Sequence, residues 1–234
     1  MPRIRNADYE RIADNISAKK GDFKLYLVAA EGDKTEAIYF QAIKNLFKNA
    51  NNSSVHVEFI DRTQEDAGKS EPKYVHKTII DMETWLQKKG YQITERDELW
   101  IIVDVDDYDN RKNSFETLMK ACEKKTYFNM ALSNPCFEIW LILHYEKADI
   151  LQSFVISEKF MRKRPSLCKT RWKQLKTPNK SDKEIFESLF EQTPIAIERA
   201  KQLQPCKIDK QHLEKHICTD VYKLLEKLYK ILNS

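Results

Sequence analysis

The feature that most constrains the fold of this chain is an apolar run, residues 99–103, that leads directly into acidic residues. Its sequence, Leu-Trp-Ile-Ile-Val, is typical of a strand buried in a parallel sheet. Asp104 and Asp106 follow, at the edge where open α/β sheets bind ligands. Residues two apart in an extended strand point to the same side, so these carboxylates would repel each other without a cation between them. Mg²⁺ or Mn²⁺ suits such oxygen ligands, and the alternative is an acidic turn that caps the next helix.

The hydrophobic patterning on either side of this run predicts an α/β fold. Expected strands alternate with expected helices, which favours a mostly parallel sheet with right-handed crossovers. The strands are expected at 23–30, 55–60, 99–103 and 127–132, and the helices at 37–47, 74–89 and 114–125. Ser133 or Asn134 before Pro135 favours a further helix that begins at the proline.

Helical spacing alone follows Tyr145, so the second half of the chain is expected to differ from the first. The expected helices span 150–164, 183–190, 194–204 and 219–232. We therefore predict a polar lead-in over 1–22, a catalytic α/β domain over 23–148, and a helical lobe over 149–234 that is appended to the sheet or wrapped around it.

Two further acidic residues are predicted to lie at the same sheet edge as Asp104. Glu31 follows the first strand, before Gly32, which permits a tight turn. Glu138 is a carboxylate in the first turn of an otherwise apolar helix. The alternative for Glu138 is that it complements the helix dipole, and Asp33, Thr35 and Glu36 after Glu31 are interpreted as helix-start residues. Lys34, in the turn after Glu31, could contact a phosphate.

Charge is distributed unevenly along the chain, although the net charge is only +4. Residues 159–180 contain nine Lys or Arg residues and no Asp or Glu, and they include Phe160 and Trp172. Cations neutralise phosphates and an exposed aromatic ring offers a base a stacking surface, so this strip favours nucleic-acid binding. The alternative is a solvated helix pair with Trp172 folded inward. The residues expected to contact nucleic acid are Arg162, Lys163, Arg164, Lys169, Arg171, Trp172 and Lys173.

Other features of the composition exclude several classes of protein. The chain has only four glycines, so a Gly-rich phosphate loop is not expected. No apolar run approaches a membrane span and the N-terminus has no apolar signal core, so we expect a cytoplasmic protein with no membrane partner. The five cysteines are scattered, as expected of reduced thiols. Cys206, His212, His216 and Cys218 suggest a zinc site, but their spacing matches no standard closed site.

Three stretches together resemble the RloB-like family, prokaryotic proteins with a Toprim-type catalytic fold. The resemblance is close over about residues 23–145 and looser beyond them. The long third stretch is specific, whereas an Asp-x-Asp pair alone is not. The stretches are Glu31-Gly-Asp-Lys-Thr-Glu36-Ala-Ile-Tyr-Phe40, Asp104-Val-Asp106-Asp107, and Ser133-Asn-Pro-Cys-Phe-Glu138-Ile-Trp-Leu-Ile-Leu-His144.

The resemblance implies roles for the four carboxylates and for partners. Glu31 would be the general acid/base or a metal-linked carboxylate, Asp104 and Asp106 metal ligands, and Glu138 the residue that completes the cluster. The family is associated with phage defence and abortive infection, often beside an ATPase. This chain has Val105 where the family pattern commonly has a basic residue, which removes a cation that could contact phosphate.

Residues and resemblance together predict a Mg²⁺- or Mn²⁺-dependent nuclease that cleaves phosphodiester bonds of DNA or RNA. The alternative is a non-catalytic nucleic-acid or nucleotide sensor that signals to a partner ATPase. Strand-passage or primase-like chemistry is a weaker third interpretation, because the chain lacks room for the extra domains. The sequence leaves the identity of the nucleic acid and homo-oligomerisation open.

Overall fold

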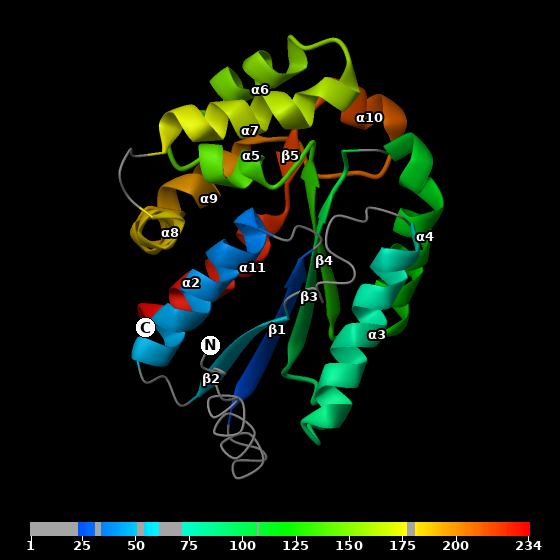
Figure 1. Cartoon of the computed structure of the whole chain (residues 1–234), viewed down its shortest axis with the longest axis vertical. Helices are drawn as coiled ribbons and strands as arrows, with labels where there is room; N and C mark the ends of the chain where they lie inside the picture. The colour runs from blue at the N-terminus through cyan, green and yellow to red at the C-terminus, as the bar shows by residue number, and fades with distance from the viewer. Residues whose placement is uncertain (1–22, 31–33, 51–53, 61–71, 107, 177–180) are drawn as a thin grey trace, which may run out of the picture.

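A five-stranded sheet forms the centre of the computed structural model (Figure 1). The structure describes residues 23–30, 34–50, 54–60, 72–106, 108–176 and 181–234, with 72–78 described by their backbone. The strand order is β2 (Val55–Ile60), β1 (Lys24–Ala30), β3 (Glu98–Asp104), β4 (Phe128–Asn134) and β5 (Cys218–Thr219). The first four strands run parallel and β5 is antiparallel to β4, so the predicted mostly parallel α/β fold is confirmed.

Helices cover both faces of the sheet. One layer contains α3 (Pro72–Lys88) and α4 (Tyr108–Lys124), and the opposite layer contains α2 (Thr35–Asn49) and α11 (Val221–Leu232) (Figure 1). The remaining helices lie mainly beyond the carboxyl ends of the strands. They are α5 (Glu138–Ile142), α6 (Ala148–Ile156), a 3₁₀ turn (Met161–Lys163), α7 (Arg164–Leu175), α8 (Asp182–Glu191), α9 (Thr193–Gln202) and α10 (Lys210–Lys215).

The central strand β3 is buried on both faces, as its continuous apolar run predicts. Leu99, Ile101 and Val103 belong to the core beneath α3 and α4. Trp100 and Ile102 belong to the opposite core, which also contains residues of α2, α5, α7 and α11. Because side chains alternate along a strand, Asp104 lies on the face of Trp100 and Ile102. The carboxylate at the end of β3 therefore lies on the side of the sheet whose core includes residues of α2 and α5.

The helix expected from Pro135 begins later, at Glu138, and β4 instead continues through Asn134. The Asn134–Pro135 peptide bond is cis. Ser133 pairs with Asp104 in β3 and with Thr219 in β5, and the Asn134 amide donates to the carbonyls of Leu213 (2.9 Å) and His216 (2.6 Å). These pairings with distant segments outweigh the local preference of an Asn-Pro pair for a helix start.

Three other boundaries differ from the sequence expectation. The helix α4 begins at Tyr108 rather than near Ser114. The single helix expected over 150–164 is divided, since α6 ends at Ile156 and α7 begins only at Arg164. Thr219 is a strand residue rather than a helix residue, because its hydroxyl lies 3.0 Å from that of Ser133 across β4 and β5.

The helices after Ala148 share one continuous core with the sheet. Tyr39 of α2 contacts the rings of Phe137 and Phe186 edge to face, each at a centroid distance of 5.4 Å. Phe186 of α8 in turn stacks on Trp172 of α7 at 6.0 Å. The Tyr39 hydroxyl accepts a hydrogen bond of 2.9 Å from the Trp140 indole. Helices of the C-terminal region are thus packed around α2 and α5, and the division at 148/149 stays a prediction.

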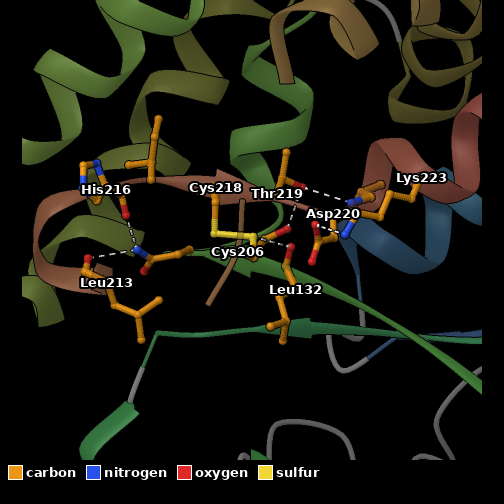
Figure 2. Close-up of a disulfide and its surroundings, with 12 residues drawn as sticks. Leu132, Cys206, Leu213, His216, Cys218, Thr219, Asp220 and Lys223 are labelled. Atoms are coloured by element: carbon orange, nitrogen blue, oxygen red, sulfur yellow. Dashed lines mark hydrogen bonds and ion pairs between the residues drawn. A yellow bond between two sulfur atoms is a disulfide. The ribbon is translucent and has the colours of Figure 1, made fainter. Parts of the chain in front are cut away.

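A disulfide joins Cys206 to Cys218, whereas the sequence predicted reduced thiols (Figure 2). The bond ties the segment before α10 to β5, whose neighbouring residue Asp220 donates its backbone N–H to the Leu132 carbonyl at 2.7 Å. The expectation failed because pairing depends on which loops the fold brings together, and the spacing of the cysteines does not encode that. The disulfide also excludes the zinc site considered from these two cysteines, since a zinc ligand is a thiolate.

None of the helices in the described part of the chain combines the length and apolar composition needed to cross a bilayer.

Replacing Tyr39 by Phe is expected to destabilise the protein by about 1–3 kcal/mol, because the buried Trp140 N–H loses its acceptor. Urea denaturation followed by fluorescence measures the change. Tyr222→Phe, on the partly exposed side of α11, is the matched control and should change stability little. Equal stabilities of the two variants would contradict the role assigned to this hydrogen bond.

Removing the disulfide with the double substitution Cys206→Ser and Cys218→Ser should lower the free energy of unfolding by roughly 3 kcal/mol, the entropic value for a short closed loop. Reductant should destabilise the wild type similarly and leave the double variant unchanged. Without reductant, thiol titration of the denatured wild type should detect only Cys122, Cys136 and Cys168. Detection of all five thiols in freshly purified protein would contradict the pairing.

Candidate functional site

Asp104 ends β3 at the carboxyl edge of the sheet and is half-buried. Its backbone is fixed by pairing with Ser133, and the ladder continues one residue further because the Val105 N–H donates to the Ser133 carbonyl at 2.9 Å. Val105 is itself buried in the core beneath α3 and α4. The side chain between the two aspartates therefore has a packing role, and a basic residue at this position would face that apolar core.

Asp106 is held by α4 rather than placed beside the Asp104 carboxylate. Arg111, which is 1% exposed, donates from Nη1 to Asp106 Oδ1 and to the Asp104 backbone carbonyl, both at 3.1 Å. The guanidinium also lies 5.0 Å from the centre of the Phe115 ring. The rule that residues two apart share a side does not extend to Asp106, because the strand ends at Asp104 and the chain turns.

Glu138 occupies the first turn of α5 and is only 5% exposed. Among the described residues, none donates a hydrogen bond to its carboxylate. A buried carboxylate without donors is costly, and a nearby cation offsets that cost.

Cys136, two residues earlier, is fully buried, and burial raises the pKa of its thiol, with further contributions from Cys168, Glu138 and Asp104. Burial therefore favours the neutral thiol form of Cys136.

Lys169 of α7 brings a positive charge to these carboxylates. Partial burial lowers the pKa of Lys169, but the charges of Glu138, Cys136, Asp104 and Glu36 outweigh that effect, so the pKa is raised. The interactions with Lys169 and Cys136 show that Asp104 and Glu138 lie in one electrostatic environment. The convergence of the predicted carboxylates into one metal site stays a prediction.

Glu36 is the acidic residue whose position the sequence analysis missed. It was interpreted only as part of a helix start, yet it is 9% exposed on α2 and its charge acts on Lys169. The spacing between Glu36 and Tyr39 could have indicated this position, because residues three apart share a helix face and the Tyr39 side chain is buried. Glu31 lies outside the described residues, and Lys34 is exposed immediately before α2.

The donor chemistry of the site fits a hard divalent cation, although the ligands are incompletely assembled. Asp104, Glu138 and Glu36 offer only carboxylate oxygens, which Mg²⁺ and Mn²⁺ prefer. Within the described ranges, however, no three His, Cys, Asp or Glu side chains are grouped closely enough to hold a metal ion. Asp106 is turned to Arg111, and the search does not cover Glu31.

The basic strip divides into buried and exposed residues. Trp172 is 5% exposed and stacks on Phe186, so the expectation that its ring is free for a base is wrong. Arg164 is 4% exposed and donates to backbone carbonyls, including that of Glu214 at 3.0 Å. Arg171 forms an ion pair with Glu146. Of the residues predicted to contact nucleic acid, Arg162, Lys163, Lys169 and Lys173 remain exposed.

His144 is part of the core of α5. It is 4% exposed, its Nδ1 lies 3.0 Å from the Trp140 carbonyl, and its ring contacts the Trp140 ring edge to face at 4.8 Å. Burial lowers the pKa of His144 to about 4, and the positive charge of Arg199 acts in the same direction. The imidazole is therefore neutral at physiological pH and belongs to the packing of the motif.

Comparison with known proteins gives one match. The model of a family described as RloB-like protein matches residues 26–228, which is most of the chain. No curated protein and no solved structure matches the chain.

Acidification is expected to destabilise the protein through His144. Because its pKa is lower in the folded state, its contribution is complete above pH 6.5, decreases as the pH falls towards about 4, and is absent below that. The full effect is roughly 3 kcal/mol. Denaturation of the wild type and His144→Gln at a series of pH values measures it, and the variant should show a shallower loss of stability between pH 6.5 and 4. Parallel pH profiles would contradict the assignment.

Proposed function

Because this chain belongs to the RloB-like family, we propose that it is a metal-dependent nuclease that cleaves phosphodiester bonds of DNA or RNA. The observation that carries the proposal is that Asp104 and the buried Glu138, to which no described residue donates a hydrogen bond, both act electrostatically on Lys169. Asp104 ends β3 at the carboxyl edge of the sheet, which is where parallel α/β sheets place ligands. A carboxylate pair next to an exposed cationic helix suits a metal ion together with a phosphate.

In this proposal Asp104 and Glu138 are the inner ligands of Mg²⁺ or Mn²⁺, with Glu31 and Asp106 as further ligands. The metal would activate a water molecule and stabilise charge on the phosphate. Glu31 would also be the general acid/base. Asp106 can contribute only by exchanging its contact with Arg111 for the metal, and Arg111 would then stay bound to the Asp104 carbonyl.

The cations of the site would bind the substrate. Lys169 is exposed while its charge interacts with Glu138, so it would contact the phosphate nearest the carboxylates. Lys34, exposed before α2, would contact the phosphate from the opposite helix. Arg162, Lys163 and Lys173 would hold the strand away from the cleaved bond. Neutralising phosphates with such side chains gives affinity without sequence preference.

The resemblance carried by the three motifs supports a role in phage defence or abortive infection, with an ATPase as a partner protein. Cleavage would then be restrained until the partner responds to infection. The contact of Asp106 with Arg111 offers a physical form of restraint, because one expected ligand is withheld while that ion pair persists.

A second function is favoured by the incomplete assembly of the ligands. If Asp106 stays with Arg111 and no third described carboxylate joins Asp104 and Glu138, the site binds nucleic acid or a nucleotide without cleaving it. The protein would then be a sensor that signals to an ATPase. The two functions differ in the consequence of removing the Asp104 charge.

Replacing Asp104 by Asn should reduce Mn²⁺-dependent cleavage by at least about 10²-fold, because a metal ligand is lost while the shape of the side chain is kept. Gel assays with single- and double-stranded DNA and RNA, with and without a partner ATPase, measure the rate. Asp109→Asn is the matched control in the same acidic stretch, since Asp109 is exposed and pairs with Lys210, and it should cleave normally.

Failure of the wild type to cleave any substrate under all these conditions would overturn the nuclease proposal. Nucleic-acid binding that is unaffected by Asp104→Asn but is lost with Lys169→Gln and Lys173→Gln together would select the sensor. Cleavage retained by Asp104→Asn would instead place the reaction at another site.

A further inference from the structure

Phe160 is a large apolar side chain left in solvent at the start of the basic strip. It is 56% exposed, on the segment that connects α6 to α7. Lys163 places its ammonium group 5.0 Å from the centre of the Phe160 ring, and the nearby residues Lys159 and Arg162 are also exposed. An exposed ring surrounded by cations is the arrangement that stacks a base while neutralising its phosphate.

The segment that carries Phe160 is fixed to the body of the protein. The Phe160 N–H donates to the Glu158 carboxylate at 2.9 Å, and the Lys163 N–H donates to the Phe160 carbonyl at 2.9 Å. The buried Arg164 donates to the backbone carbonyls of Glu158 and Glu214, each at 3.0 Å. The backbone that carries the ring is therefore fixed before a ligand arrives, which reduces the entropic cost of binding.

The exposed face of α7 continues from this ring. Lys169 and Lys173 are four residues apart and both exposed, and the neutral polar residues Ser166, Thr170 and Gln174 complete that face. From Arg162 to Lys173 the cations extend over roughly 16 Å at the rise of a helix. Lys169, in this series, is the residue whose charge interacts with Glu138 and Asp104. The cationic face thus connects Phe160 with the carboxylate site.

We propose that Phe160 and Lys163 form a stacking site for an unpaired base, so that this face binds single-stranded nucleic acid in preference to a duplex. The bases of a duplex are stacked on each other and expose only their edges, whereas an unpaired base can place its face on an aromatic ring. The inference deepens the proposed nuclease by naming single strands as its substrate, but binding itself requires no cleavage.

The test is fluorescence anisotropy in EDTA, where no metal-dependent cleavage occurs, with a mixed-sequence oligonucleotide as single-stranded RNA, single-stranded DNA and duplex DNA. The wild type should bind the single strands more tightly. Phe160→Ala should weaken single-strand binding by at least about fivefold and leave duplex binding nearly unchanged. Phe160→Trp should retain or improve single-strand binding. Ile195→Ala, an apolar side chain that is 50% exposed on α9, is the matched control and should have no effect.

Lys163→Gln separates the contribution of charge from that of stacking. It should reduce the slope of log affinity against log salt by about 0.7 for single strands, whereas Phe160→Ala should leave the slope unchanged. Equal binding of single strands and duplex by the wild type, or equal losses on both in Phe160→Ala, would overturn the proposal. Failure of the protein to cleave would leave these binding results untouched, so the two proposals fail separately.

Discussion

The hydrogen bond from the Trp140 indole to the Tyr39 hydroxyl is the interaction on which the arrangement of the site depends. Tyr39 lies three residues after Glu36 on α2, and Trp140 lies two residues after Glu138 in α5. Both partners are fully buried, with Phe137 and Phe186 packed around Tyr39. Because a buried donor cannot lose its acceptor without cost, the bond fixes α2 relative to α5. The two acidic residues that those helices carry are thereby held on the same side of the sheet.

Because these helices are fixed relative to each other, the negative charge of the site is balanced by nearby cations rather than by movement of the carboxylates. Carboxylates held on one side of the sheet by fixed helices cannot move apart to relieve repulsion, so nearby positive charge must offset it. Lys169 supplies one charge from α7, and Arg111 supplies another to Asp106 from the opposite helix layer. A divalent metal and a phosphate together would compete with these contacts. Under the proposed function, the cations that interact with these carboxylates are also the groups that a substrate phosphate would contact.

Most of the sheet was predictable because its strands are governed by local patterns. The run at 99–103 is apolar on both faces and the segment 55–60 alternates, and both became strands at the expected positions. The predictions that failed involve distant partners. Pro135 did not begin a helix because Ser133 and Asn134 are bonded to segments near residue 216, and Trp172 is buried because α8 places Phe186 against it. At the candidate site, the roles of Asp104 and Glu138 stay predictions, and the contact of Asp106 with an arginine five residues later could not be inferred from the strand pattern.

The long motif over residues 133–144 therefore mixes two kinds of residue that sequence alone does not separate. Asn134, Phe137, Trp140 and His144 are buried and bonded or packed within the core, and they define the shape of the turn that follows β4. Glu138 alone combines charge, burial and the lack of a described donor. Since an apolar or amide side chain could fill that position without electrostatic cost, packing gives no reason for a carboxylate there. A nearby cation does give one: Lys169 supplies positive charge to this carboxylate, and the proposed metal ion would supply more.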